Sequence, residues 1–301
     1  MVETIHMPNS EAAQHRVLKL HVLTEATIQH IQECLTAVGI ACLTLKGPHL
    51  AYSVYLLPLE RVWCDLDILV RPNEARKAVD VLVQNGWRRI PEVRQRRFSA
   101  KHSYNYKILS PFGVSVELHR DFTSHDRYPV PIEDFFRRAE SFRFLETEAR
   151  GLAPTDLLLH LCLHMTGSYF LVEPKHVRDI ALLLAARSID WRLFVNNAKF
   201  AGAKAGCWMA LRAAIAQHGA LVPEWVLADL EPTQRRQRWL ERWLDPAVFP
   251  IYKGPTQSMW EYQWRLGLAL MDHPRDWIPL LMKYGARRIM DLVGRIGFSK
   301  S

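Results

Sequence analysis

The spacing of apolar residues divides the chain into two parts with different predicted structure. In the first part, helical periodicity alternates with short runs of β-branched and other apolar residues, a pattern typical of mixed helices and strands. From residue 154 onward the apolar residues follow helical spacing, and joints rich in Pro, Gly and Asp separate the segments. We therefore expect a mixed α/β domain over residues 1–150 and an all-helical domain over residues 151–301.

The elements of the first part are predicted from periodicity and from turn signals. Helices are expected where apolar positions repeat about every 3.6 residues, and strands where they alternate or form short runs. One helix should end at Asn85-Gly86, and a turn at Ser110–Gly113 should separate two strands. The predicted helices span residues 11–39, 49–57 and 74–84, and the predicted strands span 41–45, 65–70, 102–109, 114–119 and 141–147.

The second part contains helical periodicity alone. Its predicted helices span residues 155–167, 175–187, 190–200, 203–218, 233–244, 257–271 and 275–293. A small mixed sheet followed by a run of helices belongs to the α+β class.

Composition indicates a folded chain without a membrane span. Hydrophobic residues make up 49% and charged residues 23%, and no apolar stretch approaches the ~20 residues that a membrane helix needs. The first twenty residues lack the features of a secretory signal, and the five cysteines are scattered without metal-site or redox spacing. We therefore expect a cytoplasmic protein with reduced cysteines.

The charge balance favours an anionic partner without identifying it. Thirty-nine Lys and Arg against thirty-one Asp and Glu give a net charge of +8. Much of the excess lies in residues 88–101 and 287–300. Such runs are most often solvated surface, but nucleotide, nucleic acid and acidic peptide all remain open as partners.

An acidic pair lies in the predicted strand over residues 65–70. Asp65 and Asp67 are two residues apart, so in a strand they would point to the same face, roughly 7 Å from each other. Carboxylates at the end of an apolar strand are costly unless they are paired or bind a cation. The other interpretation is a chance surface pattern, since Asp-x-Asp alone is a weak signal.

Two further features support a nucleotide site. Lys46-Gly47 lies at a predicted strand-to-helix turn, where glycine allows backbone N–H groups to approach phosphates; the alternative is a plain tight turn. Glu117 alternates with Val116 and Leu118 in a later strand. If that strand lies beside residues 65–70, Glu117 would complete a three-carboxylate cluster suited to two Mg²⁺ ions.

Several motifs occur together along the chain. They are Lys46-Gly47 opening a helix, Tyr52 and Tyr55 on that helix, Arg61 before Asp65-Leu66-Asp67, Glu117-Leu118-His119, LAPTDLLLHLCLHMTG over 152–167, Val177-Arg178-Asp179-Ile180 and Asp190-Trp191. In these motifs the chain resembles the uncharacterised nucleotidyltransferases of the DNA polymerase β-like superfamily. The resemblance runs through most of the chain. It implies a polymerase β-like palm domain followed by a helical domain that binds the acceptor or closes the cleft.

The resemblance also implies a reaction and its residues. A nucleoside monophosphate would pass from an NTP, with ATP as the first expectation, to an acceptor, and pyrophosphate would be released. By resemblance Asp65, Asp67 and Glu117 are catalytic residues and ligands of two Mg²⁺ (or Mn²⁺) ions. Lys46, Gly47 and Arg61 would support the NTP phosphates. Two departures from the wider superfamily are Pro48 directly after Gly47 and Glu instead of Asp at position 117.

Some residues further along the chain are candidates for contact with the acceptor. His160 and His164 follow Asp156 at intervals of four, so the three share one helix face. The sequence HLCLH lacks the Glu of a zinc-protease helix, and buried structural roles are the commoner outcome for such residues. The candidates for an acceptor cleft are His119, His160, His164, Arg178 and Asp179.

Three functions are compared. The first is a transferase that acts on a small molecule or a peptide. The second is a nucleic-acid-modifying or binding module, which the net charge allows but no aromatic-basic motif or recognition helix supports. The third is a non-catalytic partner protein that retains the fold. The acceptor, the base of the NTP and the oligomeric state are open at this point.

Overall fold

The computed structural model describes residues 11–90, 105–123, 128–247 and 259–272. The predicted helix over 275–293 and most of both basic runs lie outside the described residues. The chain divides into two compact units, which are described separately. The first comprises Met1–His125, Val130–His160 and Leu182–Asp190; the second comprises Asp126–Pro129, Leu161–Ala181 and Trp191–Ser301.

The first unit is built on a seven-stranded mixed sheet, in the order β3-β4-β5-β2-β1-β7-β6. The pairs β2·β5 and β1·β7 are parallel, and the remaining neighbours are antiparallel. The strands are β1 (Cys42–Thr44), β2 (Leu66–Val70), β3 (Arg88–Arg89), β4 (Asn105–Leu109), β5 (Ser115–His119), β6 (Glu140–Phe144) and β7 (Thr147–Gly151).

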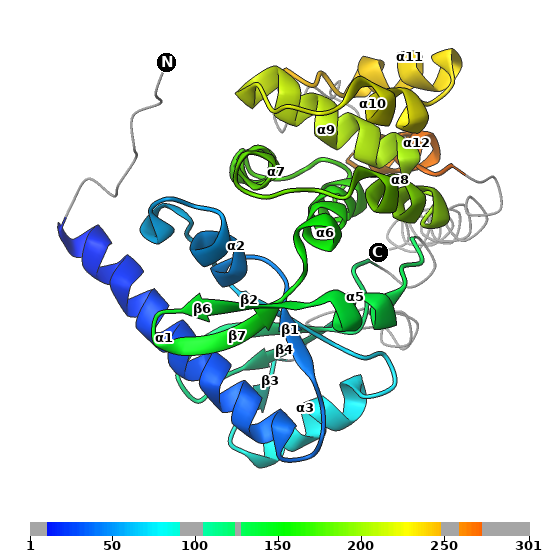
Figure 1. The fold of residues 1–301 in the computed structure, drawn as a ribbon. Coiled ribbons are helices and arrows are strands. Elements are labelled where there is room, and N and C mark those ends of the chain that lie inside the picture. Colours follow the sequence, from blue (N-terminus) through cyan, green and yellow to red (C-terminus); the bar gives the residue numbers. More distant parts are fainter. Residues whose placement is uncertain (1–10, 91–104, 124–127, 248–258, 273–301) are drawn as a thin grey trace, which may run out of the picture. The chain divides into compact units, whose positions relative to one another are not determined.

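Helices α1 and α3 cover one face of this sheet (Figure 1). The strands alternate, so that one set of side chains enters the core with the apolar sides of these helices while the other set faces away. The helices of the first unit are α1 (Glu11–Thr36), α2 (Pro48–Ser53), α3 (Ala75–Gln84) and α5 (Ile132–Arg138), with a 3-10 turn η1 (Pro58–Glu60). The core includes Ile31, Leu66, Ile68, Val79, Leu82, Val116 and Leu118.

The second unit is helical. Its α9 (Lys204–His218) is buried on most sides, and small residues allow this: a Cβ added at Gly206 would lie 2.3 Å from Oγ1 of Thr166. The other helices are α8 (Trp191–Phe200), α10 (Glu224–Leu230), α11 (Gln234–Trp243) and α12 (Met259–Leu270). Two more helices, α6 (Pro154–Gly167) and α7 (Lys175–Ala186), each belong partly to both units.

The α+β fold class predicted from the sequence is confirmed: a mixed sheet is followed by helices. Three details of the predicted elements were wrong. The helix expected over 49–57 ends at Ser53, and the single strand expected over 141–147 is a hairpin of β6 and β7 that turns at Leu145 and Glu146. The short elements α5, α10 and β3 were not predicted.

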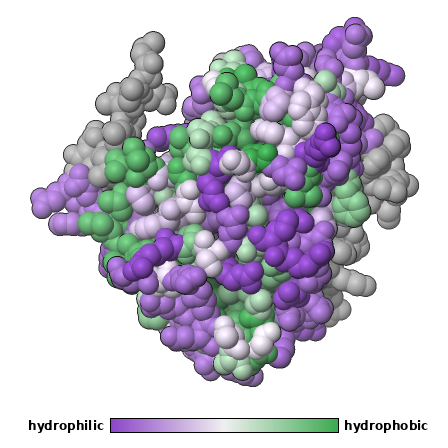
Figure 2. Space-filling view, viewed as in Figure 1, coloured by the Kyte–Doolittle hydropathy of each residue, from purple (hydrophilic) through white to green (hydrophobic). Residues whose placement is uncertain are grey.

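The surface carries both polar and apolar side chains. Figure 2 shows hydrophilic residues with groups of hydrophobic residues between them on the face that it draws. None of the helices among the described residues combines the length and the apolar composition that crossing a membrane requires.

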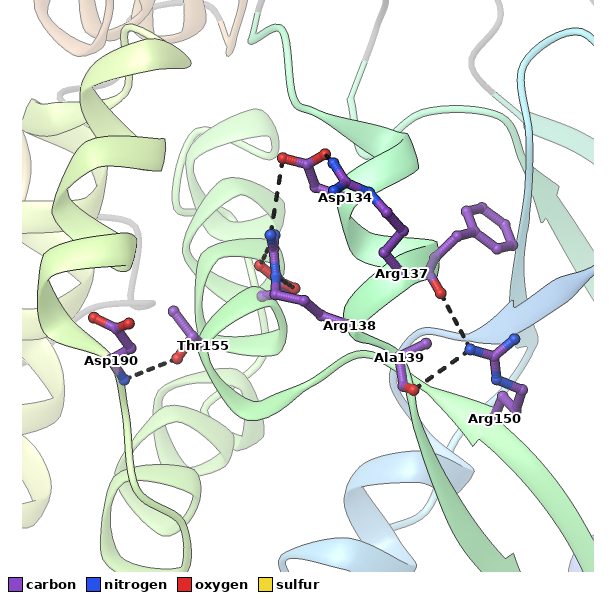
Figure 3. Close-up of polar contacts among 9 residues, drawn as sticks. Asp134, Arg137, Arg138, Ala139, Arg150, Thr155 and Asp190 are labelled. Atoms are coloured by element: carbon purple, nitrogen blue, oxygen red, sulfur yellow. Dashed lines mark hydrogen bonds and ion pairs between the residues drawn. The ribbon is translucent and has the colours of Figure 1, made fainter.

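A buried ion pair joins α5 to the first turn of α6. Arg138 donates from Nε and Nη2 to the two carboxylate oxygens of Asp156, both at 2.9 Å (Figure 3). Asp156 is fully buried, and Arg138 is partly exposed. Nearby, Arg150 donates to the carbonyl of Ala139, and the amide of Asp190 donates to Oγ1 of Thr155. The Arg138–Asp156 pair holds the first turn of α6 against α5, and the Asp190–Thr155 bond holds it against the segment after α7.

A close contact fixes α2 against the end of β7. His49, in the first turn of α2, is buried, and its ring lies 4.6 Å from that of Phe142 between ring centroids. A Cβ added at Gly151 would lie 2.5 Å from Cε1 of His49. Such a distance is too short for any side chain, so the helix that follows Gly47 depends on glycine at position 151.

Replacing Gly151 with Ala should destabilise the first unit by about 1–3 kcal/mol, because the added methyl overpacks a buried contact. The backbone of Gly151 is not in the left-handed region, so steric overlap with His49 is the whole expected cause. Urea denaturation measures the effect. In a protein that already carries His49→Ala, adding Gly151→Ala should leave the free energy of unfolding almost unchanged. An equal cost of Gly151→Ala with and without His49 would contradict the explanation.

Candidate functional site

Two carboxylates meet on adjacent parallel strands. The register of β2 and β5 pairs Asp67 with Glu117. Their neighbours Leu66, Ile68, Val116 and Leu118 point into the core. Since side chains alternate along a strand, Asp67, Glu117 and also His119 lie on the opposite face of the sheet. The apolar pattern of both strands therefore places these polar groups together.

Asp67 is the most enclosed acid of the group. It is 2% exposed, and its two oxygens face different partners. Lys46 places Nζ 3.4 Å from Oδ2, and His119 places Nε2 2.9 Å from Oδ1. A buried carboxylate needs such partners, because burial without them would be very costly.

Glu117 is held by β4, the other neighbour of β5. Nζ of Lys107 lies 2.6 Å from Oε1 of Glu117, and Nδ2 of Asn105 donates to Oε2 at 2.6 Å. Nε2 of His119 lies 3.6 Å from the same Oε2. Both β4 residues face the site because the antiparallel register pairs Lys107 with Glu117 and Asn105 with His119. The carboxylate is thus fixed from two sides.

Asp65 directly precedes β2 and is partly buried. Burial raises the pKa of its carboxyl, and the negative charges of Asp67 and Glu117 raise it further. Lys46 and Lys107 act in the opposite direction. The three carboxylates therefore repel one another, and an added cation would relieve this repulsion.

The loop between β1 and α2 carries Lys46 to the acids. Gly47 has a φ of 57°, a left-handed value that favours glycine, and Pro48 occupies the first turn of α2. An added Cβ at Gly47 would touch the side chain of Trp63 at 3.4 Å, so the loop also lies close to that ring. Because Leu45 donates its amide to the carbonyl of Asp67, the loop starts beside the acidic strand.

Arg61, the other predicted phosphate contact, is buried after η1. Its Nη1 donates to the carbonyl of its neighbour Val62 at 2.7 Å. This bond indicates that Arg61 shapes the loop before the acidic strand. A role toward phosphates stays a prediction.

His160 belongs to the first unit, and the charges of Lys46 and Asp67 influence the pKa of its imidazole. Burial lowers the pKa of its imidazole to about 3, and Lys46 is the next cause in the same direction. Its ring packs edge-on against Phe122, 4.5 Å away between centroids. His160 is therefore an enclosed, uncharged residue near Lys46 and Asp67, and its contact with an acceptor stays a prediction.

The remaining predicted acceptor contacts lie in the second unit. These are His164, Arg178 and Asp179. The ring of His164 lies 5.1 Å from that of His176 between centroids, and Asp179 is fully buried. Their role toward an acceptor stays a prediction.

Sequence reasoning missed two residues of the site. Asn105 and Lys107 were not singled out, although alternation in β4 gave a signal: they flank Tyr106, which packs on the core, and both face the acids. Nε2 of His119 lies beside both carboxylates, and the expected contact of His119 with an acceptor stays a prediction.

The acidic group formed by Asp65, Asp67 and Glu117, together with His119, has the chemistry of a divalent-cation site. Asp67, Glu117 and His119 each offer one ligand atom, and these atoms all lie within 4.8 Å of one another. Carboxylate oxygens suit Mg²⁺ and Mn²⁺, and an imidazole nitrogen suits transition metals. The residues present therefore fit a bound divalent metal.

A mixed sheet with carboxylates on adjacent strands, preceded by a Lys-Gly loop, defines the class of the chain as nucleotidyltransferase-like. Residues 10–218 match the family described as "Uncharacterised nucleotidyltransferase". The chain belongs to this family, and membership supports a general role in nucleotidyl transfer.

Comparisons with individual proteins add little. No curated protein matches the chain. Among solved structures, it is similar to an antigenic nucleotidyltransferase-like protein from Paracoccidioides brasiliensis, with 14% identity and a TM-score of 0.41 over 69% of this chain and 92% of that chain.

Proposed function

We propose that the chain transfers a nucleoside monophosphate from an NTP, ATP first among the four, to a small-molecule or peptide acceptor. An acceptor oxygen would form a bond to the α-phosphorus, and the bond from that phosphorus to the bridging oxygen would break. Pyrophosphate would leave. The observation that supports this most strongly is the buried Asp67 beside Glu117, with Nζ of Lys46 3.4 Å from Asp67.

The acids have separate roles in this proposal. Asp65 and Asp67 would hold two Mg²⁺ (or Mn²⁺) ions, and Glu117 would be a ligand of one of them. When bound, the metals supply an activated acceptor oxygen and neutralise charge on the departing pyrophosphate. Glu117 would also receive the acceptor proton on a carboxylate oxygen.

The cations would bind the triphosphate. Lys46 is 15% exposed at its side chain and already lies against a carboxylate, so an arriving phosphate could share it. Backbone N–H groups after Gly47 would add hydrogen bonds, although Pro48 contributes none. Arg61 would support the same anion from its loop. Residues 151–301 would bind the acceptor, and the candidates for contact are His119, His160, His164, Arg178 and Asp179.

The test is an isothermal titration of the full chain with each of the four NTPs, with and without Mg²⁺. We expect one NTP to bind only when Mg²⁺ is present. That NTP, labelled at its α-phosphate, then reports transfer of label to candidate acceptors. If no NTP binds under either condition, the proposal is wrong and a non-catalytic role is favoured.

A further inference from the structure

The four oxygens of the two facing carboxylates are divided between two kinds of partner. Oδ2 of Asp67 and Oε1 of Glu117 are each paired with a lysine, Lys46 and Lys107. The other two oxygens, Oδ1 of Asp67 and Oε2 of Glu117, face Nε2 of His119 at 2.9 and 3.6 Å. Each carboxylate thus has one oxygen paired with a lysine and one oxygen beside the imidazole nitrogen.

Nε2 of His119 either donates a proton to the oxygen beside it or shares a metal ion with these oxygens. A nitrogen lone pair beside two carboxylate oxygens would be repelled unless a proton or a metal ion lies between them. His119 is 4% exposed, so water screens this repulsion little. Asn105 also holds Oε2 of Glu117 from behind, as outer partners of metal-ligating carboxylates do.

The distances from the imidazole nitrogen to the two carboxylate oxygens agree with a shared metal ion. Ligand nitrogen and oxygen atoms at about 2.0–2.2 Å from a metal lie roughly 3–3.6 Å from one another. The separations of 2.9 and 3.6 Å from Nε2 to the two oxygens are close to this range. One ligand atom from each of the three residues lies within 4.8 Å of the other two.

We propose that Nε2 of His119 is a metal ligand together with Oδ1 of Asp67 and Oε2 of Glu117, and that this nitrogen makes the site prefer Mn²⁺ and later first-row metals to Mg²⁺. The inference deepens the proposed function and rests on its assignment of Asp67 and Glu117 as ligands. Imidazole favours transition metals, whereas Mg²⁺ favours oxygen ligands alone.

The same division of oxygens fixes the number of ions before nucleotide arrives. Oδ2 of Asp67 and Oε1 of Glu117 are paired with lysines, whereas Oδ1 of Asp67 and Oε2 of Glu117 lie beside Nε2 of His119 and form one set of ligand atoms with it. The nucleotide-free chain should therefore bind one ion in this group. A second ion would enter with the triphosphate, when phosphate oxygens draw Lys46 away from Asp67.

The experiment measures Mn²⁺ binding to the nucleotide-free full chain by electron paramagnetic resonance. We expect one bound Mn²⁺ per chain, with electron spin echo modulation from a directly bound imidazole ¹⁴N. His119→Gln keeps an oxygen ligand of similar reach and removes the nitrogen. It should abolish the ¹⁴N signal, weaken Mn²⁺ binding by about tenfold or more, and leave Mg²⁺ binding, measured by competition, nearly unchanged.

A matched control is His30→Gln, since His30 contacts Nε1 of Trp87 on the core side of the first unit. It should bind Mn²⁺ as the original chain does and keep the ¹⁴N signal. Circular dichroism verifies that both variants fold. If Mn²⁺ binds and is lost in Asp67→Asn but carries no ¹⁴N signal, His119 is not a ligand, while the proposed function stands. If Mn²⁺ does not bind at all, the inference is overturned, and the separate NTP titration decides the proposed function.

Discussion

Replacing Asp67 with Asn should reduce the affinity for the metal–NTP complex by about 100-fold or more, or about 2.7 kcal/mol. Asn has nearly the shape of Asp but carries no charge, so it binds a divalent cation poorly and leaves Lys46 and His119 without their shared anion. Isothermal titration with Mg²⁺ or Mn²⁺ and the NTP that the chain binds measures the loss. Transfer of α-phosphate label should fall by about 10³-fold, since metal ions stabilise the transition state by several kcal/mol.

Asp80→Asn is the matched control for this substitution. Asp80 lies on α3, is largely exposed and pairs with Arg89 at the surface. It should change neither nucleotide affinity nor label transfer, because an exposed pair contributes little and lies outside the acidic group. Unchanged nucleotide affinity in Asp67→Asn, in a variant whose circular dichroism is normal, would show that the acidic group is not a metal–nucleotide site.

Replacing Arg138 with Met should destabilise the first unit by about 3 kcal/mol, the low end of the cost of breaking a buried pair. The substitution leaves the carboxylate of Asp156 fully buried without the guanidinium that donates two hydrogen bonds to it (Figure 3). Thermal unfolding followed by circular dichroism should show a Tm lowered by about 6–12 °C. The reverse change, Asp156→Asn, should cost less, because the side chain of Arg138 is 31% exposed and can reach water.

The stability of the Arg138→Met variant should depend on pH because of the carboxyl group of Asp156. Burial raises the pKa of its carboxyl, and Arg138 lowers it only in part. With a folded-state pKa above the unfolded one, the folded state binds the proton more tightly, so stability is lost as pH rises through the folded-state pKa. The Arg138→Met substitution removes the guanidinium that lowers this pKa, so the pKa rises further. The variant should therefore be less destabilised at about pH 5 than at about pH 8.

The double variant Arg138→Met/Asp156→Leu separates charge from packing. It removes both charges and should recover most of the stability that Arg138→Met loses. A double variant as unstable as Arg138→Met alone would mean that the contact stabilises through its shape and not through its charge pairing.

The acidic group was largely predictable from the sequence because strand alternation is a local signal. The patterns around Asp67 and Glu117 each gave the face of the strand, although pairing of β2 with β5 was only a condition in that argument. The position of His119 between the two acids depends on strand register and side-chain direction. Neither can be read from one strand alone, and the same is true of Lys107 on the third strand.

The errors in the predicted helices and strands also have local causes. The hairpin of β6 and β7 turns through Leu145, which has a φ of 49° without being glycine, so the usual turn residues gave no warning. Helix α5 begins directly after Pro131 and buries Ile132, Phe135 and Phe136, a spacing that does predict a helix but over only two turns. Short elements of this kind are held by tertiary contacts more than by their own sequence.

Helices α6 and α7 belong in part to each compact unit, and this limits how the chain can be dissected. Expression of residues 1–150 alone would omit Asp156 and so remove the carboxylate that pairs with Arg138. It would also remove His160, a buried residue whose pKa is influenced by the charges of Lys46 and Asp67. A recombinant fragment intended for crystallisation or for nucleotide titration should therefore retain both helices. A chimera that exchanges the helical half would be joined more safely beyond residue 190 than in the loop before α6.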